Sequence, residues 1–190
     1  WIVDPLDGTT NFAHRYPFFC VSIALEVDGQ LTLGVVYDPM AEDLFSARKG
    51  DGARLNGEPI RVTSEAALSE SLLCTGFASH RQQVLRNLQL FQDFILSSRA
   101  VRRNGSAALE LCYVAAGRLD GFWELSLHPW DVAAGALIVE EAGGRISRLD
   151  GSLLQLESPE IVASNGGIHD QMLQAIENRL AGSTIGEAEL

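Results

Sequence analysis

The chain has 190 residues, of which 46% are apolar and 21% charged, and its formal net charge at pH 7 is −11. This apolar fraction excludes an intrinsically disordered chain, and the acidity excludes nucleic acid binding through the general surface charge, because phosphate backbones need clustered Lys and Arg. No apolar run has the length of a transmembrane helix and no signal peptide is visible, so we expect neither a nucleic acid nor a membrane as a partner.

The first part of the chain is expected to form antiparallel strands. Strands are predicted for residues 1–4, 18–27, 31–38 and 43–48. Pro5 should break the first of them, because proline lacks a backbone donor. Asp28-Gly29 predicts a hairpin turn between the second and the third, and Asn56-Gly57 marks another tight turn in the Gly- and Asn-rich stretch 49–60.

From residue 72 onward, strands and helices alternate. Strands are predicted for residues 72–75, 120–125, 145–148 and 161–164, and helices for 80–98, 106–117, 130–142 and 168–181. The polar tail 182–190 should be frayed. Strands that interleave with helices after an early hairpin predict a layered mixed α/β architecture, and no linker divides the single domain 1–190.

The sequence predicts the buried face of one helix and the N-cap of another. On helix 80–98, apolar residues recur every three or four positions, which predicts one buried face made of Val84, Leu85, Leu88, Phe91, Phe94 and Ile95. Ser106, which follows Gly105, is expected to be the N-cap of the next helix, because its hydroxyl can accept a free backbone N–H group.

Cysteines and basic residues give weaker signals. The three cysteines lie far apart in apolar runs, at Cys20, Cys74 and Cys112. An odd number without C-x-x-C spacing argues against a disulfide framework or a zinc site, so we expect buried, reduced thiols in a cytoplasmic protein. The densest basic cluster consists of Arg99, Arg102 and Arg103. It is either the solvated end of a strand or a local patch that faces an anion.

The richest motif is DPLDGTT at residues 4–10. The carboxylates of Asp4 and Asp7 would diverge on a regular strand, but Pro5 and Gly8 predict a turn that brings both to one side. The carbonyl of Leu6 lies between them as a neutral oxygen ligand. A hard cation such as Mg²⁺ prefers this set of oxygens.

The residues that follow suit an anion beside such a metal. Gly8 and Thr9 supply backbone N–H groups and Thr9 adds a hydroxyl. An ordinary Asp-Pro, Asp-Gly turn is the structural alternative. A haloacid-dehalogenase-type nucleophile needs D-x-D spacing, whereas Asp4 and Asp7 are separated by two residues, so the spacing favours a metal site with water as the nucleophile.

Residues 1–12, WIVDPLDGTTNF, resemble the W-x-x-D-P-[IL]-D-G-T-x-x-F signature of the inositol monophosphatase family, which consists of magnesium-dependent, lithium-sensitive phosphatases. Residues 129–135, PWDVAAG, resemble the family's second signature, W-D-x-A-A-G, whose aspartate supplies a further metal carboxylate, here Asp131. An aspartate in the first turn of a helix also favours the helix dipole, which is the structural alternative for this residue.

A third segment, NGSAA at residues 104–108, resembles the family's Gly-Ser/Thr-Ala run, which contacts substrate hydroxyls at a helix start. In the family, a glutamate seven residues before the W-D aspartate binds the sugar-like ring, and Glu124 keeps that spacing from Asp131. The alternatives are a simple helix cap for Gly105-Ser106 and a solvent-facing strand carboxylate for Glu124. His128 is expected only to shape its loop, and three other histidines are expected at the surface: His14, His80 and His169.

The resemblance covers nearly the whole chain and implies a layered α/β/α/β/α sandwich of the inositol monophosphatase/fructose-1,6-bisphosphatase type, a Mg²⁺ cofactor and a homodimer. It implies four metal ligands, which are Asp4, the Leu6 carbonyl, Asp7 and Asp131. Asp7 and Thr9 are the implied catalytic residues. The implied substrate contacts are Leu6, Asp7, Gly8, Thr9, Gly105, Ser106, Ala107, Glu124 and Asp131.

The chain departs from the family at its start. Family members carry an N-terminal region with the first helices of the fold, a metal-binding Glu and an Asp that pairs with the threonine matched here by Thr9. No residue precedes Trp1 in this sequence, and Glu140 and Glu141 do not match the missing Glu. We expect that the sequence is a fragment of a longer product; a shortened protein that has lost catalysis is the alternative.

The expected function is Mg²⁺-dependent hydrolysis of a small phosphate monoester, with inositol monophosphate as the substrate and metal-activated water as the nucleophile. A fructose-1,6-bisphosphatase or another sugar or nucleotide phosphatase of the same superfamily is the first alternative, because the arginine cluster could bind a second phosphate. A catalytically inactive binding module that contacts larger machinery through its acidic surface is the alternative from another class.

Overall fold

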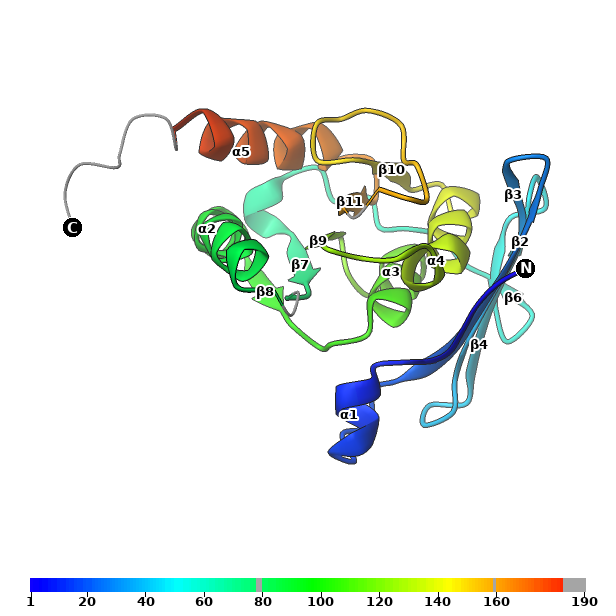
Figure 1. Cartoon of the computed structure of the whole chain (residues 1–190). Coiled ribbons are helices and arrows are strands. Elements are labelled where there is room, and N and C mark those ends of the chain that lie inside the picture. The colour runs from blue at the N-terminus through cyan, green and yellow to red at the C-terminus, as the bar shows by residue number, and fades with distance from the viewer. Residues whose placement is uncertain (78–79, 159, 183–190) are drawn as a thin grey trace.

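The computed structural model describes residues 1–77, 80–158 and 160–182. Its strands and helices are stacked in four layers (Figure 1): a first sheet, a pair of helices, a second sheet and a second pair of helices. Such stacking lets every inner element bury an apolar face against its neighbours. The predicted layered mixed α/β architecture is therefore confirmed.

The first sheet, sheet A, is antiparallel and runs in the order β1-β2-β3-β4-β5-β6. Its strands are β1 (Ile2–Asp7), β2 (Cys20–Val27), β3 (Gln30–Asp38), β4 (Asp43–Arg48), β5 (Ala53–Leu55) and β6 (Glu58–Pro59). Asp28 and Gly29 both have positive φ, at 51° and 75°, as a tight hairpin turn requires. Asn56 and Gly57 form a second such turn, and the two short strands that flank it were not predicted.

The second sheet, sheet B, is mixed and runs in the order β10-β11-β9-β7-β8. Its strands are β7 (Leu72–Thr75), β8 (Ala100–Arg102), β9 (Gly121–Leu125), β10 (Arg145–Ser147) and β11 (Glu160–Ser164). β7 lies parallel to β8 and β9, while β11 lies antiparallel to β9 and β10. The sequence indicated all of these strands except the three-residue β8.

Helices α3 (Ala107–Ala115) and α4 (Pro129–Glu141) fill the space between the two sheets, and α2 (Arg81–Ser97) and α5 (His169–Gly182) pack on the outer face of sheet B. All four helices were predicted, and the observed bounds differ from the predicted ones by one or two residues. Two short helices, α1 (Thr9–Ala13) and η1 (Leu68–Glu70), are the remaining helices of the described residues. Within these residues, no helix combines the length and apolar character that crossing a membrane requires.

The predicted buried face of α2 is confirmed at Phe94, which is buried, but it is wrong at three of its six residues. Leu85, Leu88 and Ile95 are 42–52% exposed, whereas Asn87 and Leu90 are buried. Asn87 turns inward because its amide donates to the carbonyl of Gly76 at 2.6 Å and its oxygen accepts the indole N–H of Trp123 at 2.6 Å. A buried polar side chain with satisfied hydrogen bonds thus decides which side of the helix faces the sheet.

Sheet A has one covered and one uncovered face. Along β2, the side chains of Cys20, Ser22 and Ala24 are buried on the side of α4, and the alternate side chains point the other way. In the part of the chain that the structure describes, no helix lies against that other face. Its apolar side chains are Val3, Val21, Ile23, Leu25, Leu33, Val35, Tyr37 and Leu44.

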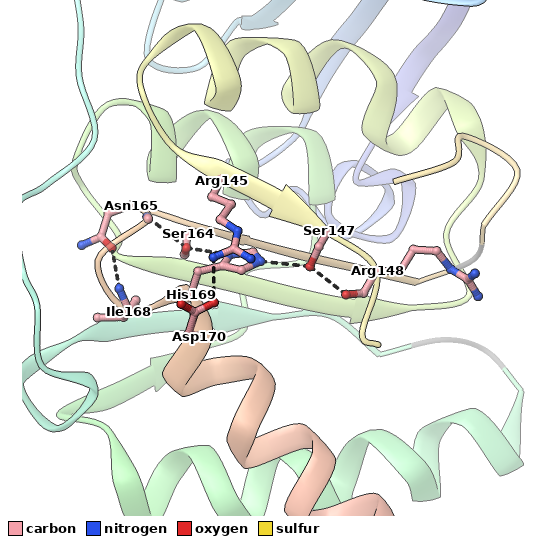
Figure 2. Close-up of polar contacts among 9 residues, drawn as sticks. Arg145, Ser147, Arg148, Ser164, Asn165, Ile168, His169 and Asp170 are labelled. Carbon is pink, nitrogen blue, oxygen red and sulfur yellow. Dashed lines mark hydrogen bonds and ion pairs between the residues drawn. The ribbon is translucent and has the colours of Figure 1, made fainter. Parts of the chain in front are cut away.

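His169 does not lie at the surface, so that prediction is wrong. It begins α5 with no exposed area, between Ser147 of β10 and Ser164 of β11 (Figure 2). Its Nε2 and Nδ1 atoms each lie 2.9 Å from one serine hydroxyl oxygen. Burial lowers the pKa of His169 to about 4, so the ring is neutral at pH 7. The histidine therefore joins α5 to sheet B.

Candidate active site

An irregularity in β1 brings Asp4 and Asp7 together. Asp4 pairs with Ser22 and Asp7 with Cys20, so β1 advances three residues (7 − 4) while β2 advances two (22 − 20). This extra residue is a bulge, which reverses the side on which the following residue points. Two aspartates that a regular strand would place on opposite faces thus share one side.

Pro5 therefore does not end the strand, in contrast to the prediction. β1 lies at the edge of sheet A, where a residue without an N–H group is tolerated, and Pro5 falls within the bulge. The carboxylate of Asp4 accepts the N–H group of Leu6 at 2.9 Å, which fixes the local turn of the chain. The ligand role of the Leu6 carbonyl stays a prediction.

Gly8 directs the chain from β1 into α1. Its φ of +87° lies in the left-handed region, and a Cβ atom there would lie 2.9 Å from the carbonyl oxygen of Phe18. Only glycine fits both conditions. Because of this turn, Gly8, Thr9 and Thr10 line the same pocket as Asp7.

Asp131 reaches the site from the first turn of α4. Its Oδ2 atom accepts the backbone N–H group of His128 at 2.7 Å, and the imidazole Nδ1 atom of His128 lies 3.4 Å from the same oxygen. His128 also stacks on Trp130 with ring centroids 4.7 Å apart. The expected loop-shaping role of His128 is thus supported by direct contacts that fix the start of α4.

Three carboxylates converge at this point. Single oxygen atoms of Asp4, Asp7 and Asp131 all lie within 4.8 Å of one another. Burial, together with the charges of Asp131 and Asp4, raises the pKa of Asp7 to about 6, although hydrogen bonds from Ser106 and Ala108 oppose the rise. Burial and the charge of Asp4 likewise raise the pKa of Asp131. Like charges this close favour a bound cation, and an all-oxygen set fits Mg²⁺.

Asp7 is also bound to the start of α3. Its Oδ2 atom accepts the hydroxyl of Ser106 at 2.6 Å and the N–H group of Ala108 at 2.9 Å. Ser106 occupies the N-cap position, but its side chain makes no cap hydrogen bond, so the predicted cap role is wrong. The carboxylate of Asp7 satisfies the free N–H group instead, and it links the metal-binding and substrate-binding segments.

Glu124 lies on β9 with its side chain in the pocket. It is 9% exposed, and within the described ranges its carboxylate makes no hydrogen bond. Burial raises its pKa well above the usual value, and the charges of Glu110, Asp7 and Asp131 add to the rise. A Cβ atom on Gly76 would lie 2.1 Å from the Glu124 carboxylate, so glycine provides the space for it. The solvent-facing alternative is excluded.

These segments surround a cavity of about 280 Å³. Its lining includes seven predicted site residues, which are Asp7, Gly8, Thr9, Gly105, Ala107, Glu124 and Asp131. Asp4 belongs to the carboxylate cluster and Ser106 contacts Asp7, but neither is among the lining residues. Lining residues without a predicted role include Asn11, Gly76, Phe77, Ser126 and Leu127. Asn11 lay inside the quoted first signature, which is the signal that could have indicated it.

The arginine cluster separates in space. The Arg99 guanidinium lies 3.5 Å from the carboxylate of Glu70, and the Arg102 guanidinium donates to the carbonyl of Val101 at 3.3 Å. Arg103 alone among the three lines the cavity. The three cysteines are free and buried, as predicted. His14 and His80 are exposed, as predicted.

Comparison with known proteins identifies the family of this chain. A sequence model described as the inositol monophosphatase family matches residues 1–181. The chain belongs to the inositol monophosphatase family.

Two curated relatives and one solved structure are highly similar to this family member. An inositol-1-monophosphatase of Synechocystis is 51% identical over 93% of this chain and 62% of its own length. A protein named Nus factor SuhB of Pseudomonas aeruginosa is 46% identical over 95% of this chain and 68% of its own length. The structure of an inositol monophosphatase from Anabaena superposes with a TM-score of 0.91 and is 47% identical, covering 94% of this chain and 71% of that one.

Proposed function

We propose that this chain is the metal-binding and substrate-binding part of a Mg²⁺-dependent phosphatase that hydrolyses inositol monophosphate to inositol and phosphate. The observation that carries the proposal is the convergence of Asp4, Asp7 and Asp131 beside a cavity that also contains the buried carboxylate of Glu124. Membership of the family and the name of the Synechocystis relative support it. The chain spans 62% of that relative, so the activity is proposed for the whole gene product.

The residues present fit a magnesium site. Asp4, Asp7, Asp131 and the Leu6 carbonyl would hold Mg²⁺, since four oxygen donors suit a hard cation. Bound Mg²⁺ supplies charge neutralisation at the phosphate oxygens and a lowered pKa of water. The Oδ2 atom of Asp7 accepts hydrogen bonds from Ser106 and Ala108, which fixes the orientation of its carboxylate.

Around this centre, the chain positions the phosphate ester. The N–H groups of Gly8 and Thr9 would donate to phosphate oxygens, and the Thr9 hydroxyl would orient the attacking water. Glu124 would accept hydrogen bonds from hydroxyls of the alcohol portion, since its oxygens have no hydrogen-bond partner within the described residues. Gly105 and Ala107, which also line the cavity, would contact the same portion.

A second candidate substrate class is a sugar bisphosphate. Arg103 lines the cavity, and no salt bridge of Arg103 occurs in the described ranges. A guanidinium in this position can bind a second phosphate through paired N–H donors. This observation favours fructose 1,6-bisphosphate as an alternative substrate at the same centre.

The proposal includes a cellular setting. Buried free thiols suit a reducing compartment, so we place the enzyme in the cytoplasm, and we propose that it acts as a homodimer. One relative carries the name Nus factor, which keeps a binding role without turnover as a competing function.

Phosphate release from inositol 1-phosphate and fructose 1,6-bisphosphate, measured at several Mg²⁺ concentrations, tests the proposal. The 190-residue chain and the complete product of its gene are assayed side by side. We expect Mg²⁺-dependent turnover of inositol 1-phosphate by the complete product. Absence of turnover with either substrate would overturn the phosphatase function and leave the binding role, while preference for the bisphosphate would support the role of Arg103.

A further inference from the structure

Glu110 lies inside the molecule with a hydrogen-bonding capacity that is only half used. It belongs to α3 and has no exposed area. Its Oε1 atom accepts the backbone N–H group of Asn104 at 2.9 Å. Its Oε2 atom is buried and has no hydrogen-bond partner in the part of the chain that the structure describes.

Such a group is costly to keep in a core. A buried carboxyl oxygen without a partner loses its hydration and gains nothing in return, so an apolar side chain would be less destabilising here. Burial also raises the pKa of Glu110 to about 8, although the Asn104 amide and the nearby charge of Arg103 oppose the rise. The cost calls for a role, and the hydrogen bond that the Glu110 carboxylate accepts from Asn104 indicates which.

The bond holds the turn that forms one wall of the cavity. Gly105 follows Asn104 with a φ of +90°, a left-handed conformation that most residues avoid. Directly before the turn, Arg103 lines the cavity; directly after it, Ser106 donates to Asp7. A shift of Asn104 and Gly105 would therefore move Arg103 at the cavity and Ser106 beside Asp7.

The same turn is held from the outside by Asn11. The side-chain amide of Asn11 donates to the carbonyl of Asn104 at 2.7 Å and to that of Phe18 at 2.7 Å, and it lies 3.3 Å from the carbonyl of Gly105. Asn11 thus binds the carbonyl side of the turn and Glu110 binds its N–H side. The turn has a partner on each face, one from the metal-binding segment and one from the core.

We propose that Glu110 is a positioning residue for substrate binding, which holds the Asn104–Gly105 turn in register with the metal-binding segment. It contacts no substrate and acts through the turn, opposite Asn11. This inference rests on the proposed phosphatase function for its kinetic part and on the structure alone for the rest. It gives the half-used carboxylate of Glu110 a role on the alcohol side of the cavity.

Two substitutions separate the acceptor from the charge. Glu110→Gln keeps an oxygen that can accept the Asn104 N–H group, and Glu110→Met removes the acceptor at similar volume. We expect Glu110→Met to raise KM for inositol 1-phosphate about tenfold, the loss that follows from one hydrogen bond, with kcat changed less than about threefold. Glu110→Gln should keep KM within about threefold. The Mg²⁺ concentration for half-maximal activity should stay the same in both.

A core substitution on the same helix provides the control. Val114→Ala shortens a buried side chain of α3 that is not among the cavity-lining residues, so it should lower the thermal midpoint without raising KM. An unchanged KM in Glu110→Met, or an equal rise in Glu110→Gln and Glu110→Met, would overturn the positioning role.

A second readout does not depend on turnover. Amide hydrogen exchange of Asn104 should become about tenfold faster in Glu110→Met and return to the wild-type rate in Glu110→Gln. If the wild-type protein hydrolyses no phosphate ester, the proposed function fails, and this exchange measurement still decides whether Glu110 holds the turn. Equal exchange in wild type and Glu110→Met would refute the inference in either case.

Discussion

The active-site carboxylates and the His169 network both bury titratable groups, but they satisfy them differently. His169 has a serine hydroxyl at each ring nitrogen, so its polar atoms are paired within the chain (Figure 2). Besides burial, the charge of Asp7 raises the pKa of Glu110, the charges of both raise the pKa of Glu124, and the described residues offer these carboxylates no cation at hydrogen-bond distance. A network whose polar atoms are all paired stabilises the fold, whereas a cluster of unpaired groups of like charge can bind a ligand.

The two regions should also respond oppositely to pH. The pKa of Glu110 is raised to about 8, so its contribution to stability is present at low pH and is lost as pH rises through 8. The pKa of His169 is lowered to about 4 from 6.5, so the unfolded chain binds the extra proton between these values. Stability from His169 is therefore full above about pH 6.5 and falls as pH drops toward 4.

The largest effect is expected from Asp7→Asn in the complete protein. The substitution keeps an oxygen that can accept from Ser106 and Ala108, but it removes the charge that a cation needs. We expect Mg²⁺-dependent turnover to fall by at least about 10³-fold, since a metal contributes several kcal/mol to the transition state. Phosphate release under saturating Mg²⁺ measures this effect. Asp51→Asn, at a mostly exposed residue, is the control and should keep full activity. Retained activity in Asp7→Asn would refute the ligand assignment.

Magnesium should stabilise the folded protein as well as support its catalytic activity. At a free concentration about 100 times its dissociation constant, we expect Mg²⁺ to raise the free energy of unfolding by about 2.7 kcal/mol. Urea unfolding at pH 7.5 with Mg²⁺ and with a chelator measures the difference. Asp7→Asn should show no such difference, because its site has lost a ligand charge. Identical unfolding midpoints of the wild-type protein in both conditions would contradict a magnesium site.

The sequence predicted the chemistry of the site better than its geometry. Asp4, Asp7 and Asp131 are brought together as the signatures indicate, because each motif carries its own local conformation. The bulge at Pro5 could not be read, since an edge strand and a tight turn suit the same residues. Ser106 suited a helix cap equally well, and only the tertiary fold brings Asp7 to its hydroxyl.

Buried polar side chains limited the prediction of the fold. Periodicity placed the buried face of α2 on its apolar residues, but Asn87 faces the sheet because Trp123 and Gly76 supply partners far away in the sequence. His169 was assigned to the surface for the same reason. A polar residue is expected to be exposed unless its partners are known, and those partners come from strands that only folding brings near.

A smaller effect is expected on the pH dependence of stability that His169 causes. Between pH 7 and pH 5, protonation of the unfolded chain at His169 should cost about 2 kcal/mol of stability. His169→Gln, which can still donate and accept, should remove this loss while the opposite contribution of Glu110 remains. The difference between wild type and variant in urea unfolding at pH 7, 6 and 5 measures it. The exposed His80→Gln variant should follow the wild-type curve, and a His169→Gln curve parallel to wild type would show that the ring is not held neutral.

The smallest effect tests whether the serines act as one network. The Ser147 hydroxyl donates to the carbonyl of Arg148 at 2.7 Å, so its oxygen accepts from the protonated Nε2 of His169, and Ser164 must then donate to the unprotonated Nδ1. Removing either hydroxyl by Ser147→Ala or Ser164→Ala should cost about 1–2 kcal/mol, because a buried polar atom loses its partner.

The double variant decides between a network and two separate bonds. Both hydroxyls bind one ring, so after the first loss the imidazole can tilt or change its tautomer, and the second loss should cost less. We expect the double variant to be about 0.5–1 kcal/mol more stable than the sum of the single effects predicts. Urea unfolding of the four proteins at pH 7 measures this coupling, with Ser97→Ala on the exposed side of α2 as a control. Strict additivity would mean that the two serines hold His169 independently, and that the ring alone, rather than a closed network, joins α5 to sheet B.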